Sequence, residues 1–147
     1  MNLNIIAFCC NHCSYEAADR AGGLRKKYPE SLRIVRVPCT GRVEPEFILR
    51  ALEKGADGVL ILGCHPGDCH YKEGNLTAFR RFILLRDVLQ SVGIEDRIGL
   101  EWVGAGEVDI FVNVVDDFVK KIQEKQGKLK RDSDGFELRA KKALESL

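Results

Sequence analysis

Short apolar runs alternate with longer amphipathic segments along this chain. The runs are nearly continuous in apolar residues, which is typical of strands buried on both faces of a parallel sheet. Arg33 and Arg36 interrupt the second run, so we expect an edge strand there, and the third run is the best candidate for a central strand. The four runs are Leu3–Phe8, Leu32–Val37, Val59–Leu62 and Ile98–Val103.

The segments between and after these runs have helical periodicity. Ser14 is expected to cap the first helix, and Pro45 suits the first turn of the second. Gly55 and Gly93 are expected stops. The expected helices cover 14–28, 45–55, 75–92 and 108–122. The expected buried side of the third helix is Leu76, Phe79, Phe82, Ile83 and Leu89.

Repeated strand–helix units with short loops predict an α/β fold with right-handed crossovers. We expect a single flavodoxin-like three-layer domain over 1–126, with a parallel four-stranded sheet in the order 2-1-3-4. The segment 127–147 is more polar and keeps Phe136, Leu138 and Leu144 among charges. This C-terminal tail is expected to be either a frayed terminus or a marginal amphipathic helix that docks on a partner.

Composition narrows the function without identifying it. The chain has 147 residues, 45% of them hydrophobic, with a formal net charge of +1 and few aromatic residues. The near-neutral charge and the sparse aromatics argue against nucleic-acid binding. No apolar run reaches the length of a membrane span, and we recognise no signal peptide. We therefore expect a cytoplasmic protein, in which clustered cysteines more often bind metal than form disulfides.

Cysteines follow three of the four apolar runs. Cys9 and Cys10 end the first run, Cys39 follows the second and Cys64 the third, with Cys13 close to the first pair. Cys69 follows Cys64 after five positions. Because parallel strands end at one edge of a sheet, thiols that are distant in sequence should meet there. A cluster of thiolates predicts a metal or an iron–sulfur centre.

The ligand set has alternatives at this point. Cys10 and Cys13 form a C-x-x-C pair at a strand-to-helix turn, which also fits a dithiol oxidoreductase. A zinc-stapled interaction module is the other alternative, although structural zinc usually uses two such pairs. The irregular spacing across three strand ends favours iron–sulfur. Four ligands are expected from five candidates, namely Cys10, Cys13, Cys39, Cys64 and Cys69.

Other polar residues give weaker signals. Cys9 precedes Cys10 on a strand, so its side chain should point to the opposite face and be a small core residue. His12, His65 and His70 adjoin cysteines but are expected to form hydrogen bonds or face solvent. Gly104–Gly106 lacks the dinucleotide fingerprint. No poised acid–base pair is evident, so we expect no independent substrate site.

Three segments around these cysteines resemble the methyl-viologen-reducing hydrogenase delta subunit family. Phe8–Tyr15 matches its F-x-C-x-x-C-x-Y start and leaves Cys9 at the variable position. Arg36–Arg42 and Gly63–Tyr71 carry the other matches, of which the last is highly specific. The resemblance covers about Leu3 to Gln126.

The resemblance implies a small protein with a [2Fe–2S] cluster. Such proteins pass electrons from a hydrogenase or a formate dehydrogenase-type partner to the flavin-containing subunit of a heterodisulfide reductase complex. They occur in methanogens and other strict anaerobes. The resemblance therefore implies an electron-transfer subunit, and it leaves the dehydrogenase partner open.

Overall fold

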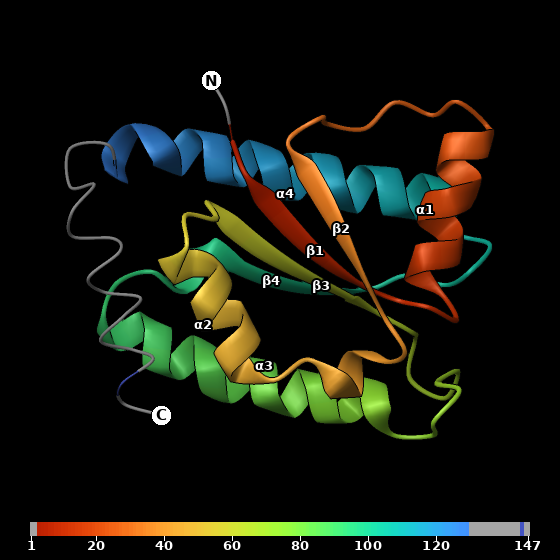
Figure 1. Cartoon of the computed structure of the whole chain (residues 1–147), viewed down its shortest axis with the longest axis horizontal. Helices are drawn as coiled ribbons and strands as arrows, with labels where there is room; N and C mark the ends of the chain where they lie inside the picture. The colour runs from red at the N-terminus through yellow and green to blue at the C-terminus, as the bar shows by residue number, and fades with distance from the viewer. Residues whose placement is uncertain (1–2, 130–144, 146–147) are drawn as a thin grey trace.

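The computed structural model describes residues 3–129 and Glu145, and its centre is a parallel sheet of four strands (Figure 1). The strands lie in the order β2-β1-β3-β4, so β1 and β3 are central and β2 and β4 are edges. The expected strand order and the edge position of the second strand are confirmed. The strands are β1 (Ile5–Cys10), β2 (Leu32–Val37), β3 (Gly58–Gly63) and β4 (Ile98–Trp102).

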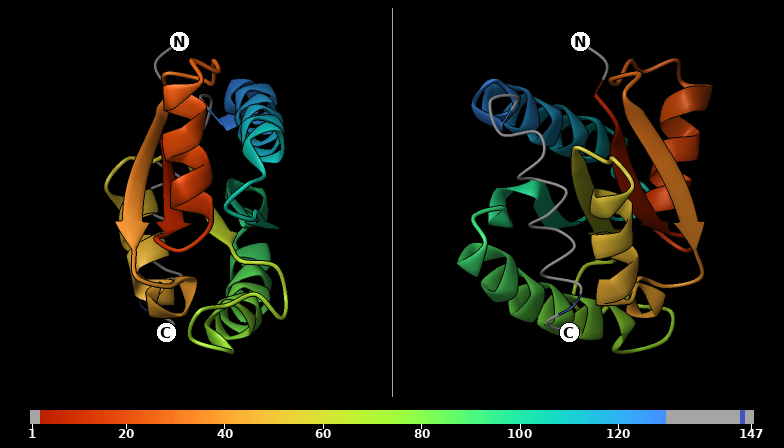
Figure 2. Two further views of the ribbon diagram at one scale, coloured as in Figure 1. Left: turned by 90° about the vertical axis from the view of Figure 1, so that its right-hand side faces the viewer. Right: turned by 60° about the vertical axis from the view of Figure 1, so that its left-hand side comes forward.

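Helices cover both faces of the sheet, which gives three layers (Figures 1 and 2). Helices α1 and α4 pack on one face, and α2 and α3 pack on the other. Short 3-10 turns, η1 (Thr40–Arg42) and η2 (Glu95–Arg97), precede α2 and β4. The α-helices are α1 (Ser14–Gly23), α2 (Pro45–Glu53), α3 (Gly74–Ser91) and α4 (Val108–Leu129).

The register of the sheet aligns the ends of the first three strands. Cys10, the last residue of β1, lies opposite Val37, the last residue of β2. Cys9 lies opposite Leu62 near the end of β3. The carboxyl ends of β2, β1 and β3 therefore meet at one edge, which we call the cysteine edge. The expected convergence of the three cysteine-bearing ends is confirmed.

Alternation along β1 divides the core into two layers. Ile5, Ala7 and Cys9 are fully buried toward α1 and α4, whereas Phe8 packs with the cluster that contains α2 and α3. All six residues of β3 are buried, as its continuous apolar run predicts. Cys10 is on the same side of β1 as Phe8, but it groups with Cys13 and Cys64 at the cysteine edge and not with the apolar core.

Two boundaries differ from the sequence-based expectation. Strand β1 begins at Ile5 and ends at Cys10, two residues later than expected at each end, because its pairing with β2 continues to Val37. Helix α1 ends at Gly23, short of the expected Tyr28. Arg25 adopts a positive φ of 57°, and its N–H donates to the carbonyl of Gly22, which closes the helix there.

The expected buried side of α3 is wrong in part. Phe82 and Leu89 are buried as expected, but Phe79 and Ile83 are 42% and 40% exposed. The buried stripe has clean helical spacing but is rotated from the expected one, and Phe79 instead contacts the ring of Trp102 at the rim of β4. The residues of this stripe are Asn75, Ala78, Phe82, Leu85 and Leu89.

Helix α4 runs through the expected boundary at 126 and ends at Leu129. Residues 130–144 and 146–147 lie outside the described residues, so the interpretation of 127–147 as a frayed or partner-docking tail stays a prediction. Pro45 begins α2, and Gly55 follows it with φ of +110°, as expected. Among the described helices, none combines the length and hydropathy that a membrane crossing needs.

Truncating Phe111 should show how much the α1–α4 layer contributes to stability. Phe111 is fully buried on α4 and meets the Tyr28 ring edge-on, whereas Phe47 on α2 is 49% exposed. We expect Phe111→Ala to lower the free energy of unfolding by about 3–5 kcal/mol in urea denaturation, since it leaves a cavity. Phe47→Ala is the matched control, and equal losses in the two variants would contradict this packing.

Candidate metal centre

Three thiols from different elements meet at the cysteine edge. Cys10 ends β1, Cys13 is the N-cap of α1, and Cys64 follows β3 directly. The Cys64 and Cys13 sulfurs are 2.9 Å apart, those of Cys64 and Cys10 are 3.7 Å apart, and all three lie within 4.8 Å of one another. Each residue is less than 5% exposed. We call this group the thiol triad.

A second pair of thiols lies beside the triad. The sulfurs of Cys39, after β2, and Cys69, in the loop after β3, are 3.8 Å apart. The N–H of Gly41 donates to the Cys39 sulfur at 3.4 Å. The Cys10 sulfur of the triad lies 3.9 Å from the carbonyl oxygen of Pro38, the neighbour of Cys39. All five expected candidates are thus at one edge, grouped as a triad and a pair.

Cys9 is separate from both groups. Its side chain is fully buried in the apolar cluster with Ile5 and Ala7, on the face that α1 and α4 cover. Burial raises the pKa of the Cys9 thiol to about 12. The expectation that Cys9 is a small core residue is confirmed, and it follows from the alternation of side chains along β1.

The triad cannot easily carry three negative charges by itself. Hydrogen bonds from Cys13 and Cys64 lower the pKa of Cys10 to about 2. The same contacts raise the pKa of Cys13 to about 12, through its bond to Cys10, and raise that of Cys64 well above its ordinary value. One thiolate is therefore stabilised by two protonated neighbours. A cation at their centre would replace those protons and allow three thiolates.

A buried hydroxyl holds together two of the strand ends that carry the triad. Ser14 Oγ donates to the carbonyl of Leu62 at 2.7 Å and accepts from the N–H of Cys10 at 2.9 Å. The expectation that Ser14 caps α1 is wrong, because Ser14 is the first residue of the helix and Cys13 holds the cap position. The hydroxyl of Ser14 instead ties the end of β1 to the end of β3.

Asn75 fixes the turn that carries Cys64. Its side chain is 1% exposed, and its amide nitrogen donates to the carbonyls of Cys64 at 2.8 Å and His65 at 3.0 Å. Sequence reasoning missed this residue. The sequence does contain a signal, which is a polar residue among the apolar residues on the buried side of α3. This signal can be recognised only when it is known which residues form that side.

Close backbone contact brings the start of α3 against the thiol pair. A Cβ on Gly74 would overlap the Cys39 sulfur, and a Cβ on Gly41 would lie 2.9 Å from Gly74 Cα. Only glycine fits at Gly74 unless Cys39 moves. The positive end of the helix dipole therefore lies beside the thiol pair. Burial nevertheless raises the pKa of the Cys39 thiol.

The histidines lie around the thiols. His12 and His70 stack with ring centroids 4.0 Å apart, and Tyr71 meets both rings edge-on. His65 Nε2 instead bonds to Glu107, whose pKa is lowered by the Gly104 N–H and by His65. The histidines thus form hydrogen bonds or lie at the surface, as expected. With Arg42 and Lys72, they form a polar rim at the cysteine edge.

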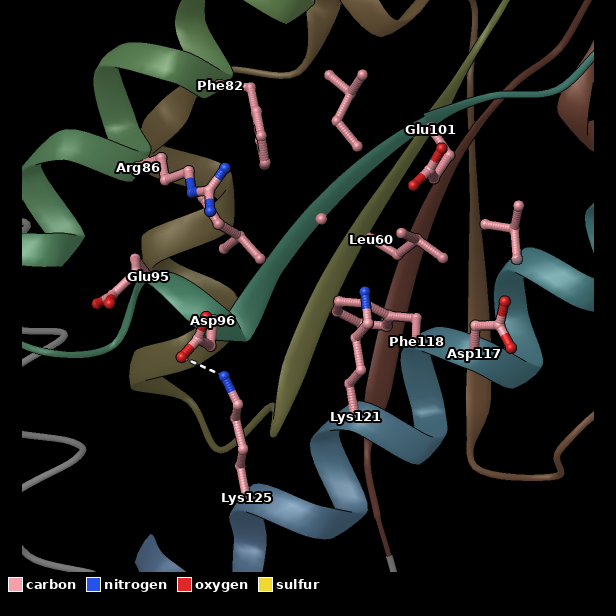
Figure 3. A pocket seen from close by; sticks show the side chains of 14 residues that line it. Leu60, Phe82, Arg86, Glu95, Asp96, Glu101, Asp117, Phe118, Lys121 and Lys125 are labelled. Carbon is pink, nitrogen blue, oxygen red and sulfur yellow. Dashed lines mark ion pairs between the residues drawn. The ribbon is translucent and has the colours of Figure 1, made fainter.

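Two hollows differ in what they offer a ligand. One, of about 640 Å³, adjoins the thiol pair and is lined by Cys39, Arg42 and Tyr71 among others. The other, of about 480 Å³, runs along the open side of β4 between α3 and α4 (Figure 3). Its floor is apolar, and an ion pair between Lys125 and Asp96 crosses one end. No thiol is among its described lining residues, so the ligand chemistry lies at the cysteine edge.

Comparison with known proteins agrees with the motifs at this edge. The family model described as methyl-viologen-reducing hydrogenase, delta subunit, matches residues 5–125. The iron-sulfur subunit of the F420-non-reducing hydrogenase of Archaeoglobus profundus is 54% identical over 122 residues, which cover 82% of this chain and 89% of the relative. The vhc iron-sulfur subunit of the F420-non-reducing hydrogenase of Methanococcus voltae is 52% identical over 120 residues, covering 81% and 83%.

A third relative is much longer. It is one of the subunits of the Ferredoxin/F(420)H(2)-dependent CoB-CoM heterodisulfide reductase of Methanosarcina acetivorans, and it is 44% identical over 121 residues. These residues cover 82% of this chain but 15% of that protein. The matching region is therefore a small part of a heterodisulfide reductase polypeptide in that relative.

Replacing Asn75 should loosen the Cys64 turn. Asn75→Leu leaves the Cys64 and His65 carbonyls without their buried donor, so we expect the free energy of unfolding to fall by about 1–3 kcal/mol in urea denaturation. Asn113→Leu, at an exposed position of α4, is the control and should change little. The role assigned to Asn75 is wrong if the two substitutions cost the same.

Proposed function

Because this chain belongs to the methyl-viologen-reducing hydrogenase delta subunit family, we propose that it is a [2Fe–2S] electron-transfer protein. It relays electrons from a hydrogenase or formate dehydrogenase-type partner to the flavin-containing subunit of a heterodisulfide reductase complex. The observation that carries the proposal is the gathering of five thiols from three strand ends at one edge. The names of the relatives support an iron–sulfur centre and an association with hydrogenase and heterodisulfide reductase.

The residues present fit an iron–sulfur cluster. Its usual ligands are cysteine thiolates, and four of Cys10, Cys13, Cys39, Cys64 and Cys69 would hold it here. The close approach of the three triad sulfurs marks a place that a metal centre would occupy. The fifth thiol would be an alternate ligand or a neighbour of the cluster. When bound, the cluster supplies uptake and release of single electrons.

The protein's own groups would set the environment of that chemistry. Burial of the triad excludes bulk water from its sulfurs. The Gly41 N–H and the start of α3 place positive dipole ends near the thiol pair, and they stabilise negative charge there. Ser14 and Asn75 fix the strand ends and the Cys64 turn through backbone bonds. The site is therefore held rigidly, as a centre that transfers electrons without rearrangement requires.

The burial of the C-x-x-C pair argues against the dithiol alternative. Cys10 and Cys13 are 2% and 4% exposed, so a substrate disulfide cannot reach either sulfur in this conformation. The Cys64 sulfur also lies 2.9 Å from that of Cys13, so the pair does not stand alone as a redox dithiol would. A zinc-stapled module uses the same thiols, and metal analysis separates it from the proposed function.

Anaerobically purified protein should contain about two irons and two acid-labile sulfides per chain. Reduction should produce the EPR signal of a [2Fe–2S] centre, with a potential on the order of −400 mV if all ligands are cysteine. Elemental analysis and an EPR-monitored titration check both points. One equivalent of zinc with negligible iron would refute the proposal in favour of a structural zinc site.

Single cysteine substitutions should show which cysteines bind the cluster at the cysteine edge and which only pack in the core. We expect Cys10→Ser, Cys13→Ser, Cys39→Ser and Cys64→Ser each to lose or strongly perturb the visible spectrum of the cluster. Cys69→Ser tests whether this loop thiol is one of the four ligands of the cluster.

Cys9→Ala is the matched control for this series. It should keep the spectrum and cost about 1 kcal/mol of stability, because Cys9 packs in the apolar core. If Cys9→Ala loses the visible spectrum of the cluster while Cys10→Ser keeps it, the roles assigned to Cys9 and Cys10 are reversed.

A further inference from the structure

Thr40 carries a buried hydroxyl without a partner among the described residues. The residue is 1% exposed, and its Oγ1 forms no hydrogen bond with another described group. A buried hydroxyl left in this state destabilises the fold, because it has given up its hydrogen bonds to water without replacing them. Native proteins rarely retain such a group without a reason, and a ligand is one of the reasons.

Thr40 lies at the cysteine edge, next to residues that carry thiols of both groups. Thr40 follows Cys39 of the pair directly and begins η1. Its Oγ1 lies 3.2 Å from the point where a Cβ of Gly63 would stand, and Gly63 directly precedes Cys64 of the triad. The absence of a side chain at Gly63 therefore leaves room for this hydroxyl at the end of β3.

A second buried hydroxyl at the cysteine edge has hydrogen-bond partners among the described residues. Ser14 Oγ donates to the Leu62 carbonyl and accepts from the Cys10 N–H, and its role is to hold the protein backbone. The Thr40 hydroxyl holds no described backbone group in this way. Trp102 also lies against Gly63, with a ring atom 3.1 Å from the same Cβ point, so the space that a side chain at Gly63 would take is bordered by an aromatic ring and by this hydroxyl.

We propose that the Thr40 hydroxyl donates a hydrogen bond to a sulfur of the bound cluster and raises its reduction potential. This inference rests on the proposed function, because it requires an iron–sulfur cluster at the cysteine edge. Hydrogen bonds to cluster sulfurs are among the protein's means of setting the potential. A donor stabilises the reduced state more than the oxidised state, because reduction adds negative charge to the sulfurs. Thr40 is thus a tuning residue and not a ligand.

The test compares Thr40→Val with Thr40→Ser in the full chain. Valine keeps the shape of threonine without the hydroxyl, and serine keeps the hydroxyl. Thr77→Val is the control, since Thr77 lines the hollow beside Cys39 but is partly exposed. The midpoint potential is measured for each protein by anaerobic EPR-monitored titration. We expect a more negative potential for Thr40→Val alone.

A second readout is independent of the potential. Pulsed EPR of the reduced proteins in D₂O detects exchangeable deuterons coupled to the cluster. Wild type and Thr40→Ser should share a deuteron coupling that Thr40→Val lacks. An unchanged potential and unchanged couplings in a loaded Thr40→Val protein would overturn the assignment and would show that the hydroxyl is unpartnered or bonds to water.

Failure to load the cluster is also informative. If Thr40→Val lacks iron but Thr40→Ser retains it, the cluster depends on the hydroxyl, which supports the proposal. If both variants lack iron, Thr40 is a packing residue and the proposal fails. Wild-type protein without iron would instead refute the proposed function itself, so the two failures are distinguishable.

Discussion

The mutual repulsion of clustered thiolates is the constraint on which this site depends. Three sulfurs within 4.8 Å can be accommodated without metal only if protons separate their charges. The lowered pKa of Cys10 beside Cys13 and Cys64 is in the direction that such an arrangement requires. A multivalent metal centre would neutralise the thiolates in place of the protons. The same close spacing of the sulfurs, which is unfavourable for bare thiolates, would then be favourable. The fold must then hold the sulfurs together before the centre arrives.

The parallel sheet supplies that rigidity. Pairing of β1 with β2 and β3 fixes the relative height of the three strand ends. Ser14 and Asn75 extend the same control beyond the strands by binding the backbone around Cys10 and Cys64. Gly41 and Gly74 allow α3 to approach the thiol pair closely. The cysteine edge is thus built mainly from backbone geometry, with few side chains committed to it.

Sequence reasoning recovers the parts of the molecule that follow from periodicity. The strand order and the convergence of the thiols follow from short apolar runs in repeated β–α units, and alternation alone separates Cys9 from Cys10. The expected phase of α3 is wrong because several apolar residues, Phe79 among them, allow more than one buried stripe. Asn75 and Thr40 cannot be identified from sequence, since their roles depend on contacts with chain segments distant from them.

X-ray absorption at the iron edge tests the central claim most directly, because it reports the atoms that surround the metal. The account predicts iron bound only to sulfur, with a second iron as the next neighbour, in protein purified without oxygen. A spectrum with light-atom ligands and no iron neighbour would contradict it. A zinc absorption edge with sulfur ligands and no iron absorption edge would also contradict it, and the thiols would then form a structural zinc site.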